Sequence, residues 1–233
     1  MSSSIQLGPF VLKVQGLALI FSVFMSYWVV KYHLKRIEAL DSSAKNQIME
    51  TLEKGVVLAL FVWKFSLFFF HPVQVISNPL SLLYYSGEER GVGLAAVTTL
   101  LYIFFRSKKD LINIEIYGEL FVSGFLIGSG VYFIFALGEL PHRFMIYGTE
   151  ILLNAFLYSR YFGMKVSEHY ESTSGKNLLH ALMWYNLGQA FISFFNPLKQ
   201  NWVWGFSLQQ IIYLALALVC IIIDFRRVEN KTS

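Results

Sequence analysis

The chain has 233 residues, of which 55% are hydrophobic and 15% are charged, and its mean hydropathy is +0.52. Long apolar runs recur along its whole length, which is typical of a polytopic membrane protein and excludes an ordinary soluble domain. The net charge is +4, and the single cysteine, Cys220, excludes a disulfide framework and a cysteine-based metal site.

In chain order, Met1–Phe10 lacks the basic start of a secretory signal peptide, so we expect the first apolar run to stay in the mature protein. Seven apolar runs are each close to the roughly 17–25 residues that a helix needs to cross a bilayer. The predicted spans are Val11–Val30, Gly55–Phe70, Gly91–Phe105, Tyr117–Leu137, Phe144–Phe162, Leu178–Phe195 and Ser207–Asp224. Because lipid offers no partner for open backbone groups, all seven are expected to be helices. The predicted fold is an all-α integral membrane protein, with one polytopic domain over residues 1–233.

The loop between the second and third spans, residues 71–90, carries a helix signal of its own. Asn78 followed by Pro79 is typical of a helix start, with asparagine as the N-cap and proline in the first turn. Tyr84 and Tyr85, which close the following apolar stretch, favour the headgroup region. We therefore expect Pro79–Tyr85 to form a short helix in the outer interface of the membrane.

Most of the 19 lysines and arginines lie on alternate loops, after the first, third, fifth and seventh spans. The opposite loops hold Arg90, Arg143 and Lys199. Because positive charge concentrates in cytoplasmic loops, we expect the N-terminus outside and the C-terminus in the cytoplasm. The basic clusters are then topology signals that contact anionic lipid, and no nucleic-acid partner is expected.

Ionisable residues inside a membrane are costly, so they are functional candidates. Lys64 lies near the middle of the second span, where it either pairs or snorkels for structural reasons or serves as a cation for a lipid phosphate. Glu119, Glu139 and Glu150 lie near span ends, and we expect them to be solvated at the interface. His180 is also expected at an interface, on the cytoplasmic side.

Neutral polar residues and glycines inside the spans predict contacts between helices. Hydrogen bonds between helices are expected of Gln15, Asn154, Asn186, Gln189, Gln209 and Gln210. Close packing is expected at Gly91, Gly93, Gly124, Gly128 and Gly130. The sequence has no metal-ligand cluster, nucleotide-binding loop or serine nucleophile elbow, so no metal or cofactor is predicted.

Several motifs together resemble the bacterial prolipoprotein diacylglyceryl transferase family. They are Leu7-Gly-Pro-Phe10 with Gly16-Leu17, Asn78-Pro-Leu80 with Gly87 and Gly93-Leu94, Gly130…Gly138-Glu139, Tyr185…Phe191…Phe194-Phe195, and Ser207…Gln210. The resemblance implies seven spans with the N-terminus outside, in a bacterial plasma membrane. It also implies transfer of diacylglycerol from phosphatidylglycerol to the cysteine of a lipoprotein signal peptide. Family members use arginines for this reaction, because a guanidinium binds phosphate in a bidentate way and keeps its charge in apolar surroundings.

The chain departs from the family where that chemistry belongs. The family's arginines fall on Val131, Gln189 and Asn196, its asparagines on Ile134 and Leu137, and its glutamate on Ser193. A cation in the second span persists as Lys64, and further candidates for phospholipid binding are Arg90, Gly130, Gly138, Glu139, Arg143, Tyr147 and Gln210. Losing one donor to a developing oxyanion costs about 10²–10³ in rate in other enzymes, so the standard reaction is expected to be lost.

Three functions stay open. The first is a non-catalytic relative that binds a membrane phospholipid, a lipoprotein signal peptide or another membrane protein. The second is an active diacylglyceryl transferase in lipoprotein biosynthesis, in which Lys64, Arg90, Arg143 and Glu139 substitute for the missing groups. The third is an unrelated seven-span transporter, against which the scarcity of polar residues at mid-span counts.

Overall fold

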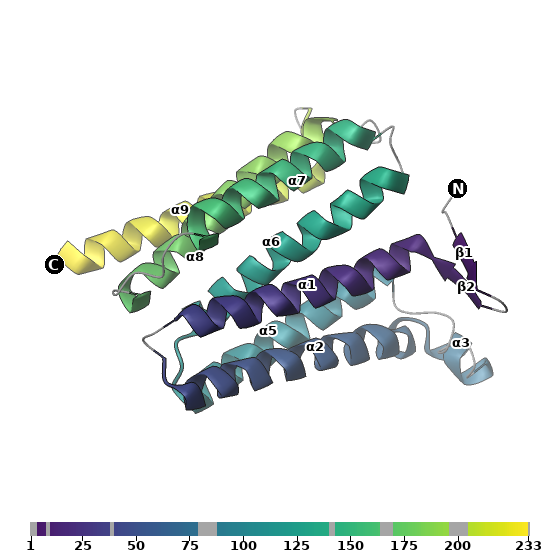
Figure 1. Cartoon of the computed structure of the whole chain (residues 1–233), viewed down its shortest axis with the longest axis horizontal. Coiled ribbons are helices and arrows are strands. Elements are labelled where there is room, and N and C mark those ends of the chain that lie inside the picture. The colour runs from purple at the N-terminus through teal and green to yellow at the C-terminus, as the bar shows by residue number, and fades with distance from the viewer. Residues whose placement is uncertain are drawn as a thin grey trace. The chain divides into compact units, whose positions relative to one another are not determined.

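The computed structural model describes residues 4–7, 10–37, 40–78, 88–139, 143–163, 170–195 and 205–232. The helices in these ranges, shown in Figure 1, are α1 (Val14–Arg36), α2 (Ser42–Phe70), α3 (Pro72–Ser77), α5 (Glu88–Asp110), α6 (Ile114–Glu139), α7 (Phe144–Tyr158), α8 (Tyr170–Ile192) and α9 (Leu208–Thr232). A π-helical turn, η2 (Ser159–Gly163), extends α7, and a 3-10 turn, η3 (Ser193–Phe195), extends α8. Helices therefore occur at each of the seven predicted apolar segments.

The all-α prediction needs one correction, at the start of the chain. Strands β1 (Ser4–Leu7) and β2 (Phe10–Lys13) form an antiparallel hairpin, in which Leu7 pairs with Phe10 and Ser4 with Lys13. The first predicted span, Val11–Val30, consequently loses its first residues to β2, and its helix runs further, to Arg36. The predicted interfacial helix Pro79–Tyr85 lies outside the described residues, although the preceding part of that loop contains α3.

Three of the described helices contain a stretch long and apolar enough to cross a membrane: Leu17–Arg36, Ile114–Gly138 and Leu208–Arg227. The burial pattern of α9 agrees with an apolar environment. Leu208, Ile212, Leu214, Leu216, Leu218, Val219, Ile221, Ile222 and Ile223 are exposed. The polar side chain of Gln210, in contrast, is fully buried. An apolar exterior around a polar interior is expected where lipid surrounds the helices.

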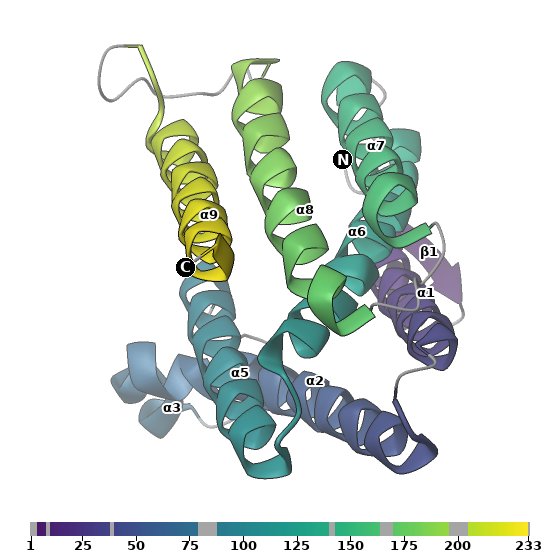
Figure 2. The same ribbon diagram turned by 90° about the vertical axis from the view of Figure 1, so that its left-hand side faces the viewer.

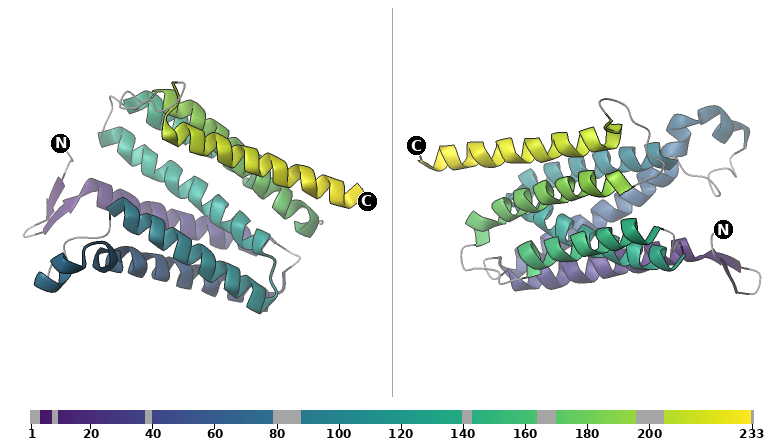
Figure 3. Two further views of the ribbon diagram at one scale, coloured as in Figure 1. Left: turned by 180° about the vertical axis from the view of Figure 1, so that it is seen from behind. Right: turned by 90° about the horizontal axis from the view of Figure 1, so that it is seen from above.

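The chain divides into two units. The smaller is Leu40–Tyr117, and the larger consists of Met1–Ala39 and Gly118–Ser233. The smaller unit is built on the pairing of α2 with α5, which run side by side in Figures 1 and 3. Asp41 caps α2 by accepting a hydrogen bond from the Ala44 backbone at 2.8 Å. Pro72 cannot continue the α2 hydrogen-bond ladder, and α3 starts there.

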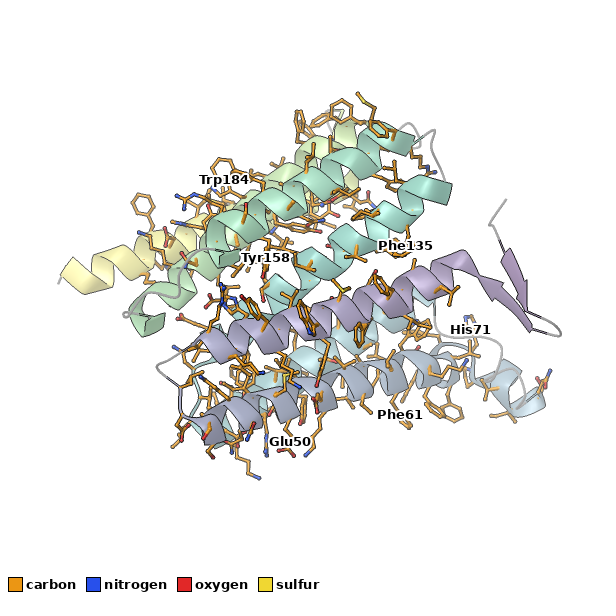
Figure 4. The ribbon with its side chains drawn as sticks, in the orientation of Figure 1. Glu50, Phe61, His71, Phe135, Tyr158 and Trp184 are labelled. Carbon is orange, nitrogen blue, oxygen red and sulfur yellow. The ribbon has the colours of Figure 1, made fainter. Side chains whose placement is uncertain are left out.

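Small residues bring α2 and α5 together at both ends of their contact. A Cβ at Gly55 would lie 3.5 Å from the Thr99 side chain, and one at Gly91 would overlap Ser66 Oγ at 2.3 Å. On the outer side of α2, Lys54 hydrogen-bonds Glu50 and lowers the pKa of that carboxyl, so Glu50 is an ionised surface group near neutral pH. Figure 4 shows Glu50 and Phe61 along this outer edge of α2.

The larger unit is arranged around α6, which lies between α1 and α7 in Figures 1 and 2. On the α1 side, a Cβ at Gly124 would lie 2.7 Å from Val30 Cγ2, and one at Gly128 would lie 3.2 Å from the Ser22 carbonyl oxygen. Phe135 extends this contact by meeting Phe21 edge to face at 5.8 Å, and Figure 4 shows it on the α1 side of α6. The expectation of close packing is therefore confirmed at Gly124 and Gly128.

The opposite side of α6 forms the apolar core of this unit. Its buried members are Val122, Leu126, Leu157, Phe162 and Ala181, which come from α6, α7, η2 and α8. Helix α8 then packs against α7 and α9, and Gly188 accepts the Leu153 side chain so closely that a Cβ would lie 2.5 Å from it. Figure 2 shows α9, α8 and α7 following one another along this unit.

The glycine contacts give the first prediction. Gly128→Ala should destabilise the protein by about 1–3 kcal/mol, because the new methyl group overlaps Ser26 Oγ and crowds the Ser22 carbonyl. Gly138→Ala on the same helix is the matched control, since no described atom lies within 4 Å of a Cβ there, and it should stay within about 0.5 kcal/mol. Thermal melting in detergent measures both. Equal melting temperatures for the two variants would contradict the close α1–α6 packing.

Candidate ligand-binding site

A group of polar side chains lies inside the larger unit where α7, α8 and α9 meet. Glu150 on α7 and Gln189 on α8 are buried, with 6% and 8% of their surface exposed, and Gln189 Nε2 donates a hydrogen bond of 2.6 Å to Glu150 Oε2. Tyr185 on α8 and Tyr213 on α9 both lie within electrostatic range of this carboxylate. The predicted hydrogen bond between helices is thus confirmed for Gln189.

Asn154 lies one turn after Glu150 on the same face of α7. It is 1% exposed, and neither its Nδ2 nor its Oδ1 has a hydrogen-bond partner among the described residues. On α8, by comparison, Asn186 Nδ2 donates to the Leu182 carbonyl of its own helix at 2.7 Å. Asn154 therefore offers one donor and one acceptor that the described part of the protein leaves unused.

The α6 side of the site is formed by Gly130. A Cβ at this position would lie 3.8 Å from Asn154 Cβ, so α6 passes within van der Waals contact of Asn154 here. One turn before Glu150, the Tyr147 ring stacks on Phe133 of α6 at a centroid distance of 5.7 Å. The structure therefore brings two of the predicted site residues, Gly130 and Tyr147, next to Asn154 and Glu150.

The site lies near one end of its helices. Glu150 is in the second turn of α7, Gln189 in the last turn of α8 and Tyr213 in the second turn of α9. Helices α7, α8 and α9 alternate in direction, so these turns belong to the same end of the unit, as Figure 2 shows. About two helical turns, roughly 10 Å, separate Glu150 from the start of α7.

The other predicted site residues occupy separate positions. Arg143 is half-buried at the N-cap of α7, and its side chain makes no capping hydrogen bond. Gly138 is in the last turn of α6, and the side chain of Glu139 lies outside the described residues. Lys64, half-buried on α2, and Arg90, exposed on α5, belong to the smaller unit.

Gln210, another predicted site residue, closes a capping box at the start of α9. Its Oε1 accepts a hydrogen bond from the Ser207 backbone N–H at 2.9 Å, and its own N–H donates to Ser207 Oγ at 3.3 Å. This reciprocal pairing across an S-x-x-Q segment satisfies two backbone donors at a helix start. The side chain is fully buried, so the box also fixes Gln210 beside the interior of the unit.

A second buried pair joins α1 to α6. His33 Nε2 lies 3.6 Å from Glu119 Oε1, with 5% and 3% of the two side chains exposed. The His33 ring also meets Phe162 of η2 edge to face at 6.1 Å. The expectation that Glu119 and Glu150 are solvated at an interface is therefore wrong, because neighbouring helices cover both carboxylates. His180, by contrast, is half-buried beside Asp224 at 3.2 Å.

Sequence reasoning named Glu150, Asn154 and Gln189 but did not join them into one site. Their spacing held a usable signal, because Glu150 and Asn154 share one face of α7, as Tyr185 and Gln189 share one face of α8. Which helix faces which is a tertiary property that this spacing does not contain. Compared with known proteins, the chain matches no family model and no curated protein.

The capping box gives the second prediction. Ser207→Ala and Gln210→Ala should each lower the free energy of unfolding by about 1 kcal/mol, because each leaves a backbone N–H at the start of α9 without its partner. The two losses should not add in the double variant, since either substitution breaks the same box. Thermal unfolding in detergent measures the cycle. Fully additive losses would contradict reciprocal capping.

Proposed function

We propose that this chain is a multi-pass membrane protein, distantly related to the diacylglyceryl transferases, that binds a membrane lipid or membrane peptide without transferring diacylglycerol. Its apolar helices and outward-facing apolar side chains support residence in a membrane. The motifs that resemble the transferase family support the relationship, and they carry with them the proposed location, a bacterial plasma membrane.

The observation that carries the proposal is the pairing of Gln189 with Glu150. Gln189 stands where the resemblance places a phosphate-binding arginine, and its amide donates to a buried carboxylate at 2.6 Å. A carboxyl group and a neutral amide provide no positive charge, so this part of the protein lacks the attraction for phosphate that the family's arginine supplies. Ile134, where the family has an asparagine, is 57% exposed and apolar.

The alternative is an active transferase with substitute cations. Arg143 favours it most, because its half-buried side chain is not used in capping α7 and it follows the Gly138-Glu139 pair at the end of α6. The alternative needs charge stabilisation as a thiol attacks a lipid headgroup, for which Lys64, Arg90 and Arg143 would have to replace the arginines of the family.

The third prediction separates these two functions. Purified protein incubated with phosphatidylglycerol and a lipoprotein signal peptide containing one cysteine should leave the peptide unmodified, because the required arginines are absent. Mass spectrometry of the peptide gives the readout, with a known transferase as the positive control. Diacylglyceryl-modified peptide that disappears with Arg143→Ala would establish the active alternative instead.

The fourth prediction concerns the proposed seven spans, with the N-terminus outside and the C-terminus in the cytoplasm. In a Cys220→Ser background, Lys199→Cys should react with a membrane-impermeant maleimide on intact cells, because its loop holds little positive charge. Lys108→Cys, in the basic last turn of α5, should react only after the membrane is permeabilised. The reverse pattern, or equal labelling of both, would overturn this orientation.

A further inference from the structure

Asn154 is a buried polar side chain in the larger unit that needs a hydrogen-bond partner from outside the described residues. It is 1% exposed, and both ends of its amide lack hydrogen bonds within the described residues. Buried amides in folded proteins are normally paired, so an amide without partners indicates a bound water or ligand. On the α6 side, Gly130 packs against this residue, since a Cβ there would meet Asn154 Cβ at 3.8 Å.

Glu150 adds a buried carboxyl group on the same face of α7. Gln189 is the side chain found bonded to it among the described residues, and a neutral amide cannot balance a carboxylate. A carboxylate in apolar surroundings must take up a proton or pair with a positive group. Tyr185 and Tyr213 lie within electrostatic range of the same carboxyl group.

These features together select a particular ligand chemistry. We propose that Glu150 and Asn154 bind a primary ammonium group, carried by the headgroup of a membrane lipid such as an ethanolamine phospholipid, with Gln189 holding the Glu150 carboxylate in position. The ammonium donates to a Glu150 oxygen and to Asn154 Oδ1, while Asn154 Nδ2 donates to a phosphate or ester oxygen of the same lipid. This inference rests on the proposed lipid-binding function and names the lipid class.

The site distinguishes headgroups by their hydrogen-bond donors. A primary ammonium has three N–H groups for the two oxygens, whereas the trimethylammonium of choline has none. A glycerol headgroup has no positive charge, and its phosphate is repelled by Glu150. The position of the site near one end of α7, α8 and α9 lets a headgroup enter while the acyl chains stay among the exposed apolar side chains.

The test uses the full chain in phosphatidylcholine nanodiscs, to which phosphatidylethanolamine or phosphatidylglycerol is added, with native mass spectrometry to count retained lipid. Wild-type protein should retain phosphatidylethanolamine about tenfold more than either other lipid, the ratio expected of one charge-assisted hydrogen bond. Glu150→Gln should remove this preference. Glu50→Gln is the matched control, because it neutralises a carboxylate whose side chain is 54% exposed, and it should retain the preference.

Asn154→Leu is a second variant that does not depend on the charge. It fills the same volume and removes the unpaired amide, so it should melt no lower than wild type and still lose about tenfold in phosphatidylethanolamine retention. Free ethanolamine added without the lipid distinguishes the two sources of the group. A Glu150-dependent rise in melting temperature with free ethanolamine, and no preference for the lipid, would support ammonium recognition with a soluble amine as the ligand.

Two results separate this inference from the proposed function. Equal retention of all three phospholipids, unchanged by Glu150→Gln, with no response to free ethanolamine, would overturn the ammonium site and leave lipid binding in place. Loss of all lipid and signal-peptide binding by folded wild-type protein would overturn both. Folding of each variant is checked by its melting transition and its elution as a single species in detergent.

Discussion

The close approach of α6 to the helices around it is the constraint on which the larger unit depends. In lipid, no hydrophobic force drives one apolar helix onto another, so association relies on close packing and on polar contacts between helices. Gly124 and Gly128 let the α1 backbone reach α6, and the other side of α6 forms the core with α7 and α8. At Gly124 and Gly128, a single added methyl group would therefore overlap atoms of α1.

This packing also decides which polar groups are buried. Glu119, one residue after Gly118, is covered because α1 lies against α6 and brings His33 within 3.6 Å of it. The π-helical turn after Tyr158 contributes to the same packing. It places Phe162 in the apolar core and against the His33 ring, while Arg160 remains exposed. A π-turn shifts the residues that follow it around the helix axis, so this one turn lets Phe162 contact both the apolar core and His33.

The sequence was sufficient to predict the helices, but it said much less about which helices pack against one another. Apolar length locates each helix, but a short apolar run such as Val11–Lys13 suits a strand as well as a helix, and pairing with Ser4–Leu7 made it a strand. Glu150 was expected to be solvated because it lies near a span end, yet α8 covers it with Gln189. Periodicity shows which residues share a helix face, whereas burial depends on the helix opposite, which only the tertiary structure supplies.

Among the described residues of this unit, the buried carboxyl groups of Glu119 and Glu150 have electrostatically different neighbours. Glu119 faces His33, a side chain that can carry a positive charge, so the α1–α6 contact can balance it from within the protein. Glu150 faces Gln189, which stays neutral at any pH. One turn away lies the amide of Asn154, which has no hydrogen-bond partner in the described part of the chain. The His33–Glu119 pair can therefore be understood as a structural contact that needs no group from outside the protein. The second needs a proton or a cation, and the proposed ammonium site rests on this need.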